Sequence, residues 1–416
     1  MRKTAAHHAP AVLSREDGAS APQSFRAIAA ALMMGVLFLT SPTFAEEGGA
    51  CGRLEGDMTH VLSDLERFGV SGSVMVIETR ELGRIAASAG LASHAPERKM
   101  TRDRAFQIGS QTKLFTAAAI VKLAKEGQLK LDDRISNYVD GVEGGDKVTI
   151  RQLLTHTSGL GDGVRPLDVP SPPPNRPVSF EFIAELSELQ GPDFAPGESW
   201  RYNNFGYDIL GKIIEKASGE SVSSYLRRSF FVPAGMDHTL VGSSDDWSGA
   251  NMAHGYWTSR GALEDMGAPR DLSWAATAGD MISTADEMVD FVRALETGSP
   301  SLGVTFDDLT AKAVPVPGAP EMPRYGYGVM ERTFGGRIVL GHGGFIQGYI
   351  SYSGVEPESG VAFSVMTALN GDPETNYEKL MERLSGAVQQ ILSTAIFAGV
   401  VKTEAGLQID CAKESE

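Results

Sequence analysis

Strand-like segments lie near both ends of this 416-residue chain, and the segments between them are mostly helical. Short apolar runs bounded by turn residues predict strands at 71–80, 83–90, 337–344, 348–355 and 361–369. Apolar residues at helical spacing predict amphipathic helices outside these strands, at 57–69 and 376–397. A sheet must bury its apolar face against another layer. Both ends of the chain are therefore expected to build one antiparallel sheet, flanked by N- and C-terminal helices.

The helical middle of the chain is expected to be inserted into that sheet. Helical patterns lie at 112–127, 179–189, 206–219 and 221–231, and the chain is longer than one ordinary hydrophobic core supports. We predict an α/β (α+β) fold with a sheet domain of residues 51–105 plus 255–416 and a helical subdomain of residues 106–254. The active site is expected between the two.

The first 45 residues differ from the rest of the chain. Arg26 precedes an apolar run at 27–39, and Thr43-Phe44-Ala45 has the pattern of a signal-peptide cleavage site. A helix over that run would rise only about 20 Å, whereas a bilayer core is about 30 Å thick. We expect residues 1–45 to be a signal peptide, the protein to be secreted to the periplasm, and no membrane span to remain after cleavage. An uncleaved anchor is the alternative.

The charge of the chain argues against nucleic acid as a partner. The formal net charge is −16, and no basic stripe stands out. The histidines at 60, 94, 238 and 254 show no metal-ligand spacing such as H-x-x-x-H, and His156 is interpreted as a structural residue. The sequence therefore predicts no metal and no cofactor, and it leaves the oligomeric state open.

Ser110 and Lys113 begin an apolar, Ala-rich helix in the stretch "GSQTKLFTAAAIVKLAKEG". Residues three apart share a helix face, so the Lys113 amine can reach the Ser110 hydroxyl. Ser needs a base before it attacks a carbonyl, and a lysine serves near pH 7 only if its pKa falls by about 3 units. Burial against Leu114 and Phe115 would contribute to that shift. The S-x-x-K spacing is compatible with a nucleophile and its base, but alone it is a weak signal.

Two further motifs follow in order along the chain. Tyr202 and Asn204 form a Y-x-N before an amphipathic helix, where Asn204 is also a suitable helix N-cap. His342 and Gly343-Gly344 end a strand-like run, where glycines permit close approach of a ligand. Each motif has a purely structural interpretation when taken alone.

Together the three motifs resemble the S-x-x-K, Y-x-N and [KH]-x-G motifs of the penicillin-recognising serine hydrolases. This superfamily includes class C β-lactamases, D,D-carboxypeptidases, D-aminopeptidases and related esterases. Flanking segments such as "VTIRQLLTHTSGL", "FFVPAGMDHT" and "YGYGV" are also similar to the family. The resemblance covers nearly all of the chain after its first 50 residues and implies a β-lactamase/transpeptidase-like fold.

The resemblance also implies roles for the motif residues. Ser110 would be the nucleophile, Lys113 or Tyr202 the base, and Asn204 would position the substrate amide and orient Lys113. His342 would take the place of the cation in the third motif, near Tyr202. The oxyanion hole would consist of the backbone N–H groups of Ser110 and Phe345, beside Gly343 and Gly344.

Gly343 departs from the pattern of the carboxypeptidases and β-lactamases. These relatives usually have Ser or Thr at this position, and its hydroxyl helps to bind a substrate carboxylate. We therefore predict a preference for substrates without a free C-terminal carboxylate, unless Arg201 or Arg324 supplies the missing contact.

The two cysteines, Cys51 and Cys411, lie near the ends of the chain that remains after residue 45. In an oxidising compartment such a pair favours a disulfide. We expect a Cys51–Cys411 bond that brings the two terminal helices together.

We therefore expect a serine hydrolase that acts through an acyl-enzyme on D-amino-acid-containing peptides, as a D,D-carboxypeptidase or D-aminopeptidase. Its partners would be small peptide, amide or ester substrates. Within the same chemistry, the alternative is a carboxylesterase or a weak class C-type β-lactamase. From another class, the alternative is a non-hydrolytic ligand- or penicillin-binding receptor.

Overall fold

The computed structural model describes residues 50–163, 177–259, 262–371 and 377–405. The predicted signal peptide and Cys411 lie outside these residues, so the cleavage site and the Cys51–Cys411 bond stay predictions. The described residues from Ala50 onwards belong to one compact unit.

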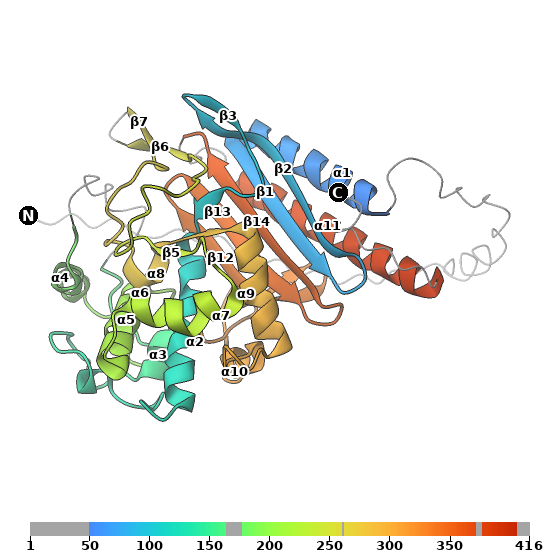
Figure 1. Cartoon of the computed structure of the whole chain (residues 1–416). Coiled ribbons are helices and arrows are strands. Elements are labelled where there is room, and N and C mark those ends of the chain that lie inside the picture. Colours follow the sequence, from blue (N-terminus) through green and yellow to red (C-terminus); the bar gives the residue numbers. More distant parts are fainter. Residues whose placement is uncertain (1–49, 164–176, 260–261, 372–376, 406–416) are drawn as a thin grey trace, which may run out of the picture. The chain divides into compact units, whose positions relative to one another are not determined.

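A nine-stranded antiparallel sheet forms the centre of this unit (Figure 1). Its order is β3-β2-β1-β14-β13-β12-β11-β10-β9, so strands from the two ends of the chain meet where β1 pairs with β14. The strands are β1 (Val70–Thr79), β2 (Gly83–His94), β3 (Glu97–Lys99), β9 (Val314–Pro315), β10 (Arg324–Tyr325), β11 (Met330–Phe334), β12 (Arg337–Ile346), β13 (Tyr349–Glu356) and β14 (Val361–Leu369). The pairing of β1 with β14 confirms the prediction that strands from both ends of the chain build one antiparallel sheet.

Helices cover both faces of the sheet. The terminal helices α1 (Ala50–Asp64) and α11 (Tyr377–Ala405) pack against each other and against the sheet, and α9 (Ala285–Thr297) packs against β1, β13 and β14 from the other side (Figure 1). Residues of β13 and β14 are buried along their whole length, because each of their faces meets a helix. Helix α11 extends further than the predicted 376–397, and the first helix begins before residue 57.

A helical layer follows the first three strands. It contains α2 (Thr112–Lys125), α3 (Ile150–Leu154), α4 (Phe180–Gln190), α5 (Phe205–Ser218), α6 (Val222–Leu226), α7 (Val232–Ala234), α8 (Ala276–Gly279) and α10 (Phe306–Thr310). Helix α2 packs against α5, α8 and β12. Phe115 of α2 stacks on Phe291 of α9 with a centroid distance of 3.9 Å, which ties this layer to the helix on the sheet.

Several short strands were not predicted. β4 (Ala105–Gln107), β8 (Met281–Thr284) and β5 (Leu240–Val241) form a three-stranded sheet, and β6 (Tyr256–Ser259) pairs with β7 (Ala262–Asp265). These elements have two to four residues each, which is too short for a residue pattern to reveal. β4 leads directly into the turn that carries Ser110.

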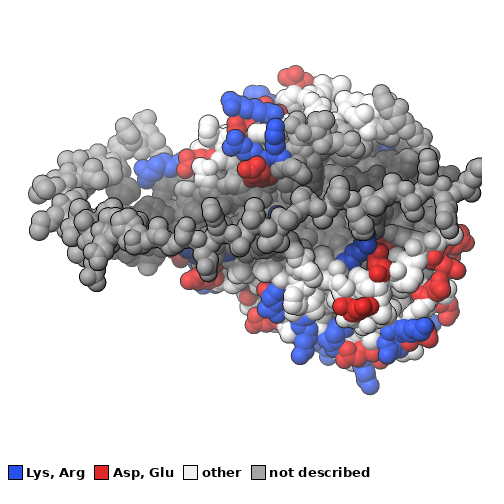
Figure 2. All heavy atoms as spheres, turned by 180° about the vertical axis from the view of Figure 1, so that it is seen from behind, with Lys and Arg blue, Asp and Glu red and all other residues white. Residues whose placement is uncertain are grey.

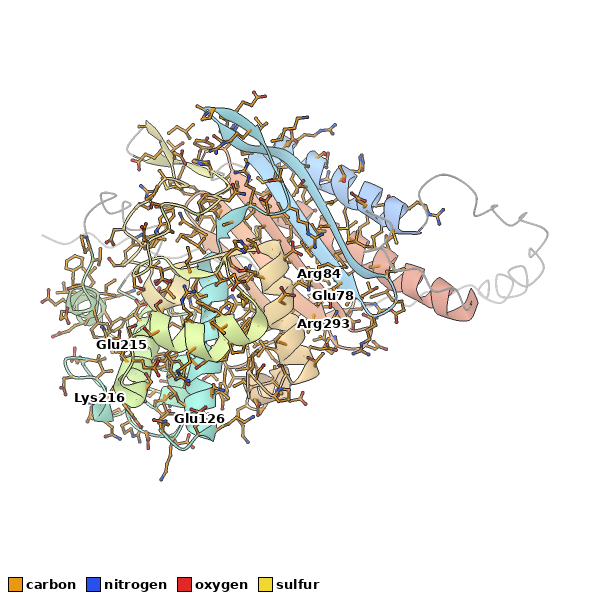
Figure 3. All side chains as sticks on the ribbon, in the orientation of Figure 1. Glu78, Arg84, Glu126, Glu215, Lys216 and Arg293 are labelled. Atoms are coloured by element: carbon orange, nitrogen blue, oxygen red, sulfur yellow. The ribbon has the colours of Figure 1, made fainter. Side chains whose placement is uncertain are left out.

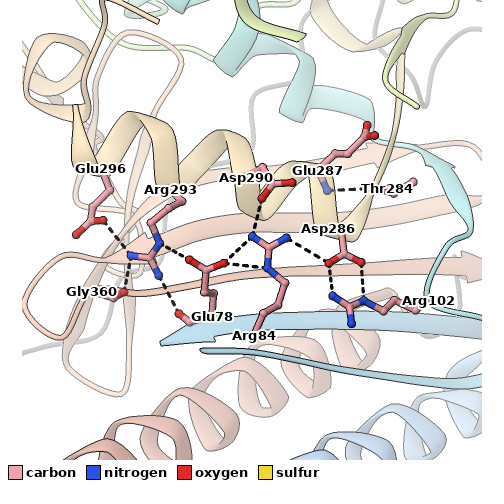
Figure 4. A network of polar contacts seen from close by, with 10 residues as sticks. All are labelled: Glu78, Arg84, Arg102, Thr284, Asp286, Glu287, Asp290, Arg293, Glu296 and Gly360. Carbon is pink, nitrogen blue, oxygen red and sulfur yellow. Dashed lines mark hydrogen bonds and ion pairs between the residues drawn. The ribbon is translucent and has the colours of Figure 1, made fainter. Parts of the chain in front are cut away.

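An ion-pair network joins α9 to the edge of β1 and β2 (Figure 4). Glu78 accepts hydrogen bonds from Arg84 at 2.5 Å and Arg293 at 2.9 Å, and Arg84 also donates to Asp290 at 2.6 Å. These groups lie between the sheet and α9, whereas Glu126, Glu215 and Lys216 lie on the helical layer (Figure 3). The network fixes α9 on the sheet (Figure 4).

Acidic and basic side chains are interspersed on the described surface of the face shown in Figure 2. Among the described residues, no helix combines the length and apolar character needed to cross a bilayer.

Candidate active site

The turn that carries Ser110 is pressed directly against β12. Ser110 lies in a 3-10 turn, Gly109–Gln111, which runs into α2. A Cβ on Gly109 would lie 2.9 Å from the Phe345 carbonyl carbon, and a Cβ on Gly344 would lie 1.9 Å from the Ile108 carbonyl oxygen. Only glycines permit this approach. Their lack of side chains therefore sets the position of Ser110 beside the strand that carries the third motif.

Lys113 is completely buried and holds three polar contacts through Nζ. Nζ lies 3.3 Å from Ser110 Oγ, 2.8 Å from Asn204 Oδ1 and 2.7 Å from the Ala278 carbonyl oxygen. Burial lowers the pKa of Lys113 to about 7, against the opposing effects of the Asp208 and Asp162 carboxylates. Near neutral pH, a substantial fraction of Lys113 is therefore in the neutral amine form, which can accept a proton.

Tyr202 lies next to this pair. Nζ of Lys113 is 4.8 Å from the centre of the Tyr202 ring. Burial raises the pKa of Tyr202 well above its ordinary value, and a hydrogen bond with Ser110 offsets only part of that rise. The Tyr202 phenol consequently keeps its proton at neutral pH, in contrast to Lys113.

Asn204 occupies the N-cap position of α5, but its side chain makes no capping bond. Asp162 caps the helix instead, since one of its carboxylate oxygens accepts the backbone N–H groups of Asn204 and Phe205. The other oxygen accepts from Asn204 Nδ2 at 3.4 Å. This bond directs Asn204 Oδ1 towards Lys113. Asp162 was missed by the sequence analysis, because nothing in its neighbourhood of the sequence indicates a contact with the Y-x-N motif.

His342 reaches the site from β12, at the position where the resemblance places the cation of the third motif. Its Nδ1 lies 2.5 Å from the Gly343 carbonyl oxygen, so Nδ1 carries the proton, and Nε2 accepts from the Tyr325 hydroxyl at 2.9 Å. Burial and the nearby Lys113 lower the pKa of His342 to about 3. The residue at the position of that cation is therefore a neutral imidazole, whose ring centre lies 6.3 Å from that of Tyr202.

His156 supports Tyr202 from behind, in agreement with its predicted structural role. The His156 ring centre lies 4.4 Å from that of Tyr202 and 4.6 Å from that of Tyr325. His156 Nδ1 accepts the Asn203 N–H at 3.2 Å, which holds the ring in place. Burial lowers the pKa of His156 well below its usual value, so this wall of the site is uncharged.

A cavity of about 450 Å³ opens beside Ser110. Its polar end is lined by Ser110, Asp162, Tyr202 and Asn204, and its middle by residues 343–345 of β12. β12 pairs with β11 only as far as Gly341, while its pairing with β13 continues to Ile346. Residues 342–346 therefore form the strand edge that faces the 3-10 turn, where the predicted oxyanion hole of the Ser110 and Phe345 N–H groups would lie.

The two arginines proposed to compensate for Gly343 are engaged elsewhere. Arg201 donates to Asp193 at 2.6 Å, and Arg324 forms an ion pair with Glu331 at 3.6 Å and donates to the Ala313 carbonyl oxygen. Neither lines the cavity. Within the described ranges, no group of three His, Cys, Asp or Glu side chains is arranged to hold a metal ion.

Comparison with known proteins agrees with this geometry. The profile of the Beta-lactamase family matches residues 64–387. A penicillin-binding protein of Bacillus subtilis (strain 168) is 34% identical over 177 residues, which are 42% of this chain and 39% of that protein. This chain spans only 39% to 57% of the length of three curated relatives that it matches.

Solved structures match over most of both chains. D-amino acid amidase from Ochrobactrum anthropi SV3, complexed with D-phenylalanine, is 26% identical with a TM-score of 0.74, covering 82% of this chain and 99% of the amidase. A D-stereospecific amidohydrolase from Streptomyces sp. is 26% identical with a TM-score of 0.67, covering 79% and 97%. The arrangement of Ser110, Lys113 and Tyr202 thus occurs in a chain whose fold is that of serine hydrolases. This protein belongs to the beta-lactamase family of the penicillin-recognising serine hydrolases.

Proposed function

We propose that the protein hydrolyses amides of D-amino acids or short D-amino-acid peptides through an acyl-enzyme on Ser110. The observation that carries the proposal is the buried Lys113 amine, 3.3 Å from Ser110 Oγ with a pKa near 7. The similarity to a D-amino acid amidase and to a D-stereospecific amidohydrolase supports the substrate class.

In the proposed acylation, neutral Lys113 takes the proton from Ser110 as Oγ bonds to the substrate carbonyl carbon. The N–H groups of Ser110 and Phe345 stabilise the resulting oxyanion, a contribution typically of about 3 kcal/mol per donor. Tyr202, whose phenol holds its proton, donates that proton to the leaving amine and receives the one held by Lys113. The C–N bond breaks, an ester on Ser110 remains, and Lys113 is neutral again.

Deacylation needs a water molecule on the ester. A small cavity of about 30 Å³ adjoins Ser110 and is lined also by Asn204, Asp208 and Phe345. This volume exceeds the roughly 10–15 Å³ that one water needs. Asp208 Oδ1 is buried without a hydrogen-bond partner among the described residues, and burial raises the pKa of this carboxyl group well above its usual value, so the group can bond to that water in either protonation state. Lys113 would then take the water proton and return it to Ser110 as the ester breaks.

A carboxylesterase is the second candidate, and Gly343 is the observation that favours it. Position 343 offers no hydroxyl to a substrate carboxylate, so the part of the site next to the scissile bond suits substrates that have no carboxylate there. A β-lactamase activity and a receptor that acylates without turnover are further alternatives on the same residues.

A substrate panel tests the proposal. We expect hydrolysis of D-phenylalanine amide with at least about tenfold preference over the L-amide, slower turnover of nitrocefin, and steady release rather than a single burst. Faster turnover of p-nitrophenyl esters with no amide hydrolysis would favour the esterase. A stoichiometric burst followed by no turnover would favour the receptor.

We also propose that the protein acts outside the cytoplasm. The apolar run at 27–39 and the cleavage pattern at 43–45 support this. Protein recovered from the periplasm should begin near Glu46 and show no titratable thiol in denaturant before reduction. Two free thiols there would contradict the Cys51–Cys411 bond, and recovery of the intact N-terminus with the membrane fraction would favour the anchor.

A further inference from the structure

The cavity beside Ser110 continues past β12 onto the sheet face under α11. Strand register shows which residues share this face. Gly343 pairs with Tyr352, and Tyr352 with Val365. On the neighbouring strand, Met330 pairs with Gly341 and Arg332 pairs with Val339. Positions 339, 341 and 343 of β12 lie on the same face of the sheet, because successive residues of a strand point to opposite faces. The distal lining is mostly apolar and consists of Met330, Phe334, Ile350, Val365, Leu384 and Val388, the last two from α11.

Arg332 is the charged side chain in this distal part. Its guanidinium carbon lies 5.4 Å from the Phe334 ring centre and 5.8 Å from that of Tyr352. Among the described residues it has no ion pair and no hydrogen-bond acceptor, whereas Arg324 on the preceding strand is paired with Glu331. A guanidinium in this position can bind an anionic group of a ligand through charge-assisted hydrogen bonds.

Tyr352 gives a second, independent observation. This residue lines the same cavity, is only 7% exposed, and its hydroxyl is buried without a hydrogen-bond partner among the described residues. Buried hydroxyls are nearly always paired. An unpaired donor beside an uncompensated guanidinium indicates a ligand with acceptor oxygens, as a carboxylate has.

The position of Tyr202 determines which part of a substrate would enter. Tyr202 lines the same cavity as Arg332, and in the proposed mechanism it protonates the leaving amine. The leaving group must therefore lie on this side of Ser110. Arg332 pairs with Val339, four residues before Gly343, which is about 13 Å along a strand. The anion that Arg332 meets is therefore remote from the scissile bond.

We propose that this distal cavity binds the leaving-group part of the substrate, and that Arg332 and the Tyr352 hydroxyl recognise a carboxylate at the far end of an apolar leaving group. The inference rests on the proposed amidase function and adds a substrate class to it: amides of D-amino acids with an apolar, carboxylate-bearing amine. Arg332 is thus a specificity-determining residue that sequence patterns do not reveal.

Two isosteric anilides test the inference. In D-phenylalanyl-4-aminobenzoate the leaving group ends in a carboxylate, and in D-phenylalanyl-4-aminobenzamide it ends in a neutral amide of the same shape. We expect wild type to favour the acid by about tenfold in kcat/KM, the low end for a charge-assisted hydrogen bond because Arg332 is partly solvated. The preference should appear as a lower KM for the acid, with a similar kcat for the two anilides. Arg332→Gln should reduce the ratio to about one, and Arg324→Gln, the matched control, should keep the wild-type ratio.

A ratio of one or less in wild type, or an equal ratio in Arg332→Gln and wild type, would overturn the inference. If neither anilide is hydrolysed, binding decides the inference by itself, and the hydrolysis of D-phenylalanine amide decides the proposed function separately. In that case calorimetry on Ser110→Ala should show tighter binding of 4-acetamidobenzoate than of 4-acetamidobenzamide, with the difference lost in Ser110→Ala/Arg332→Gln. Equal binding of the two compounds would contradict it.

Discussion

Lys113 Nζ lies 2.8 Å from Asn204 Oδ1 and 3.3 Å from Ser110 Oγ, so the second motif holds the base against the nucleophile of the first. Asn204 is held in turn by Asp162. The catalytic groups are therefore fixed by contacts between residues that lie 42 and 91 positions apart in the sequence, and each contact can be tested separately.

The pKa of Lys113 predicts the pH dependence of acylation. The base must be neutral, so kcat/KM should rise with pH through about 7 and level off above it. Lys113→Met should lose at least about 10³-fold at every pH. A pH–rate profile of wild type that is flat from pH 5 to 9 would contradict the role of Lys113.

The same depressed pKa predicts an effect on stability. The unfolded chain binds a proton on Lys113 up to about pH 10.5, and the folded protein releases it above about pH 7. Unfolding free energy should therefore rise with pH between these values, by a few kcal/mol in total. In Lys113→Met this contribution should disappear. Urea unfolding of both proteins at pH 7 and 10 measures the difference, and parallel changes in the two would contradict the shifted pKa.

Asp162→Asn tests the positioning of Asn204 and the charge near Lys113. Removing the carboxylate takes away an attraction that raises the pKa of Lys113, so the acidic limb of the kcat/KM profile should move to lower pH. Loss of the charged acceptor at the start of α5 should also lower stability by about 1–2 kcal/mol. Asp193→Asn, which removes an acidic partner of Arg201 in the same layer, is the control. If the acidic limb of the kcat/KM profile lies at the same pH in Asp162→Asn and in wild type, the Asp162 charge does not act on Lys113.

His342→Gln tests whether the third motif needs a charge. Because His342 is neutral, Gln can replace its polar contacts, and activity should fall no more than about tenfold. The acidic limb of the profile should stay near pH 7, since it belongs to Lys113. A limb that disappears in His342→Gln would show that the histidine, and not the lysine, titrates in catalysis.

Gly343→Ser tests the substrate preference. A Cβ at this position would lie 3.2 Å from Tyr352 Cδ2, so a small shift of that ring accommodates it. The added hydroxyl should raise kcat/KM for peptides with a free C-terminal carboxylate, such as D-alanyl-D-alanine peptides, by up to about tenfold. A neutral ester should change little. A wild-type enzyme that favours a D-alanyl-D-alanine peptide with a free C-terminal carboxylate at least tenfold over the same peptide as its C-terminal amide would show that Gly343 does not limit recognition.

The sequence was sufficient to predict the sheet built from both chain ends and the proximity of Ser110 and Lys113, because both follow from local periodicity. It could not reveal Asp162 or Arg332, which enter the site through tertiary packing and strand register. Nor could the sequence reveal the protonation state of His342, since it depends on burial beside Lys113, which no motif records. Short strands such as β4 and β8 depend on their partners more than on their own residues.

Intact-protein mass spectrometry during turnover tests the central claim, that Ser110 carries the acyl group, most directly. Wild type quenched in acid while it hydrolyses a p-nitrophenyl ester should gain the mass of one acyl group, located by digestion on the peptide that contains Ser110. Ser110→Ala should show no adduct and lose at least about 10³-fold in kcat. An adduct on another residue, or undiminished turnover by Ser110→Ala, would contradict the mechanism.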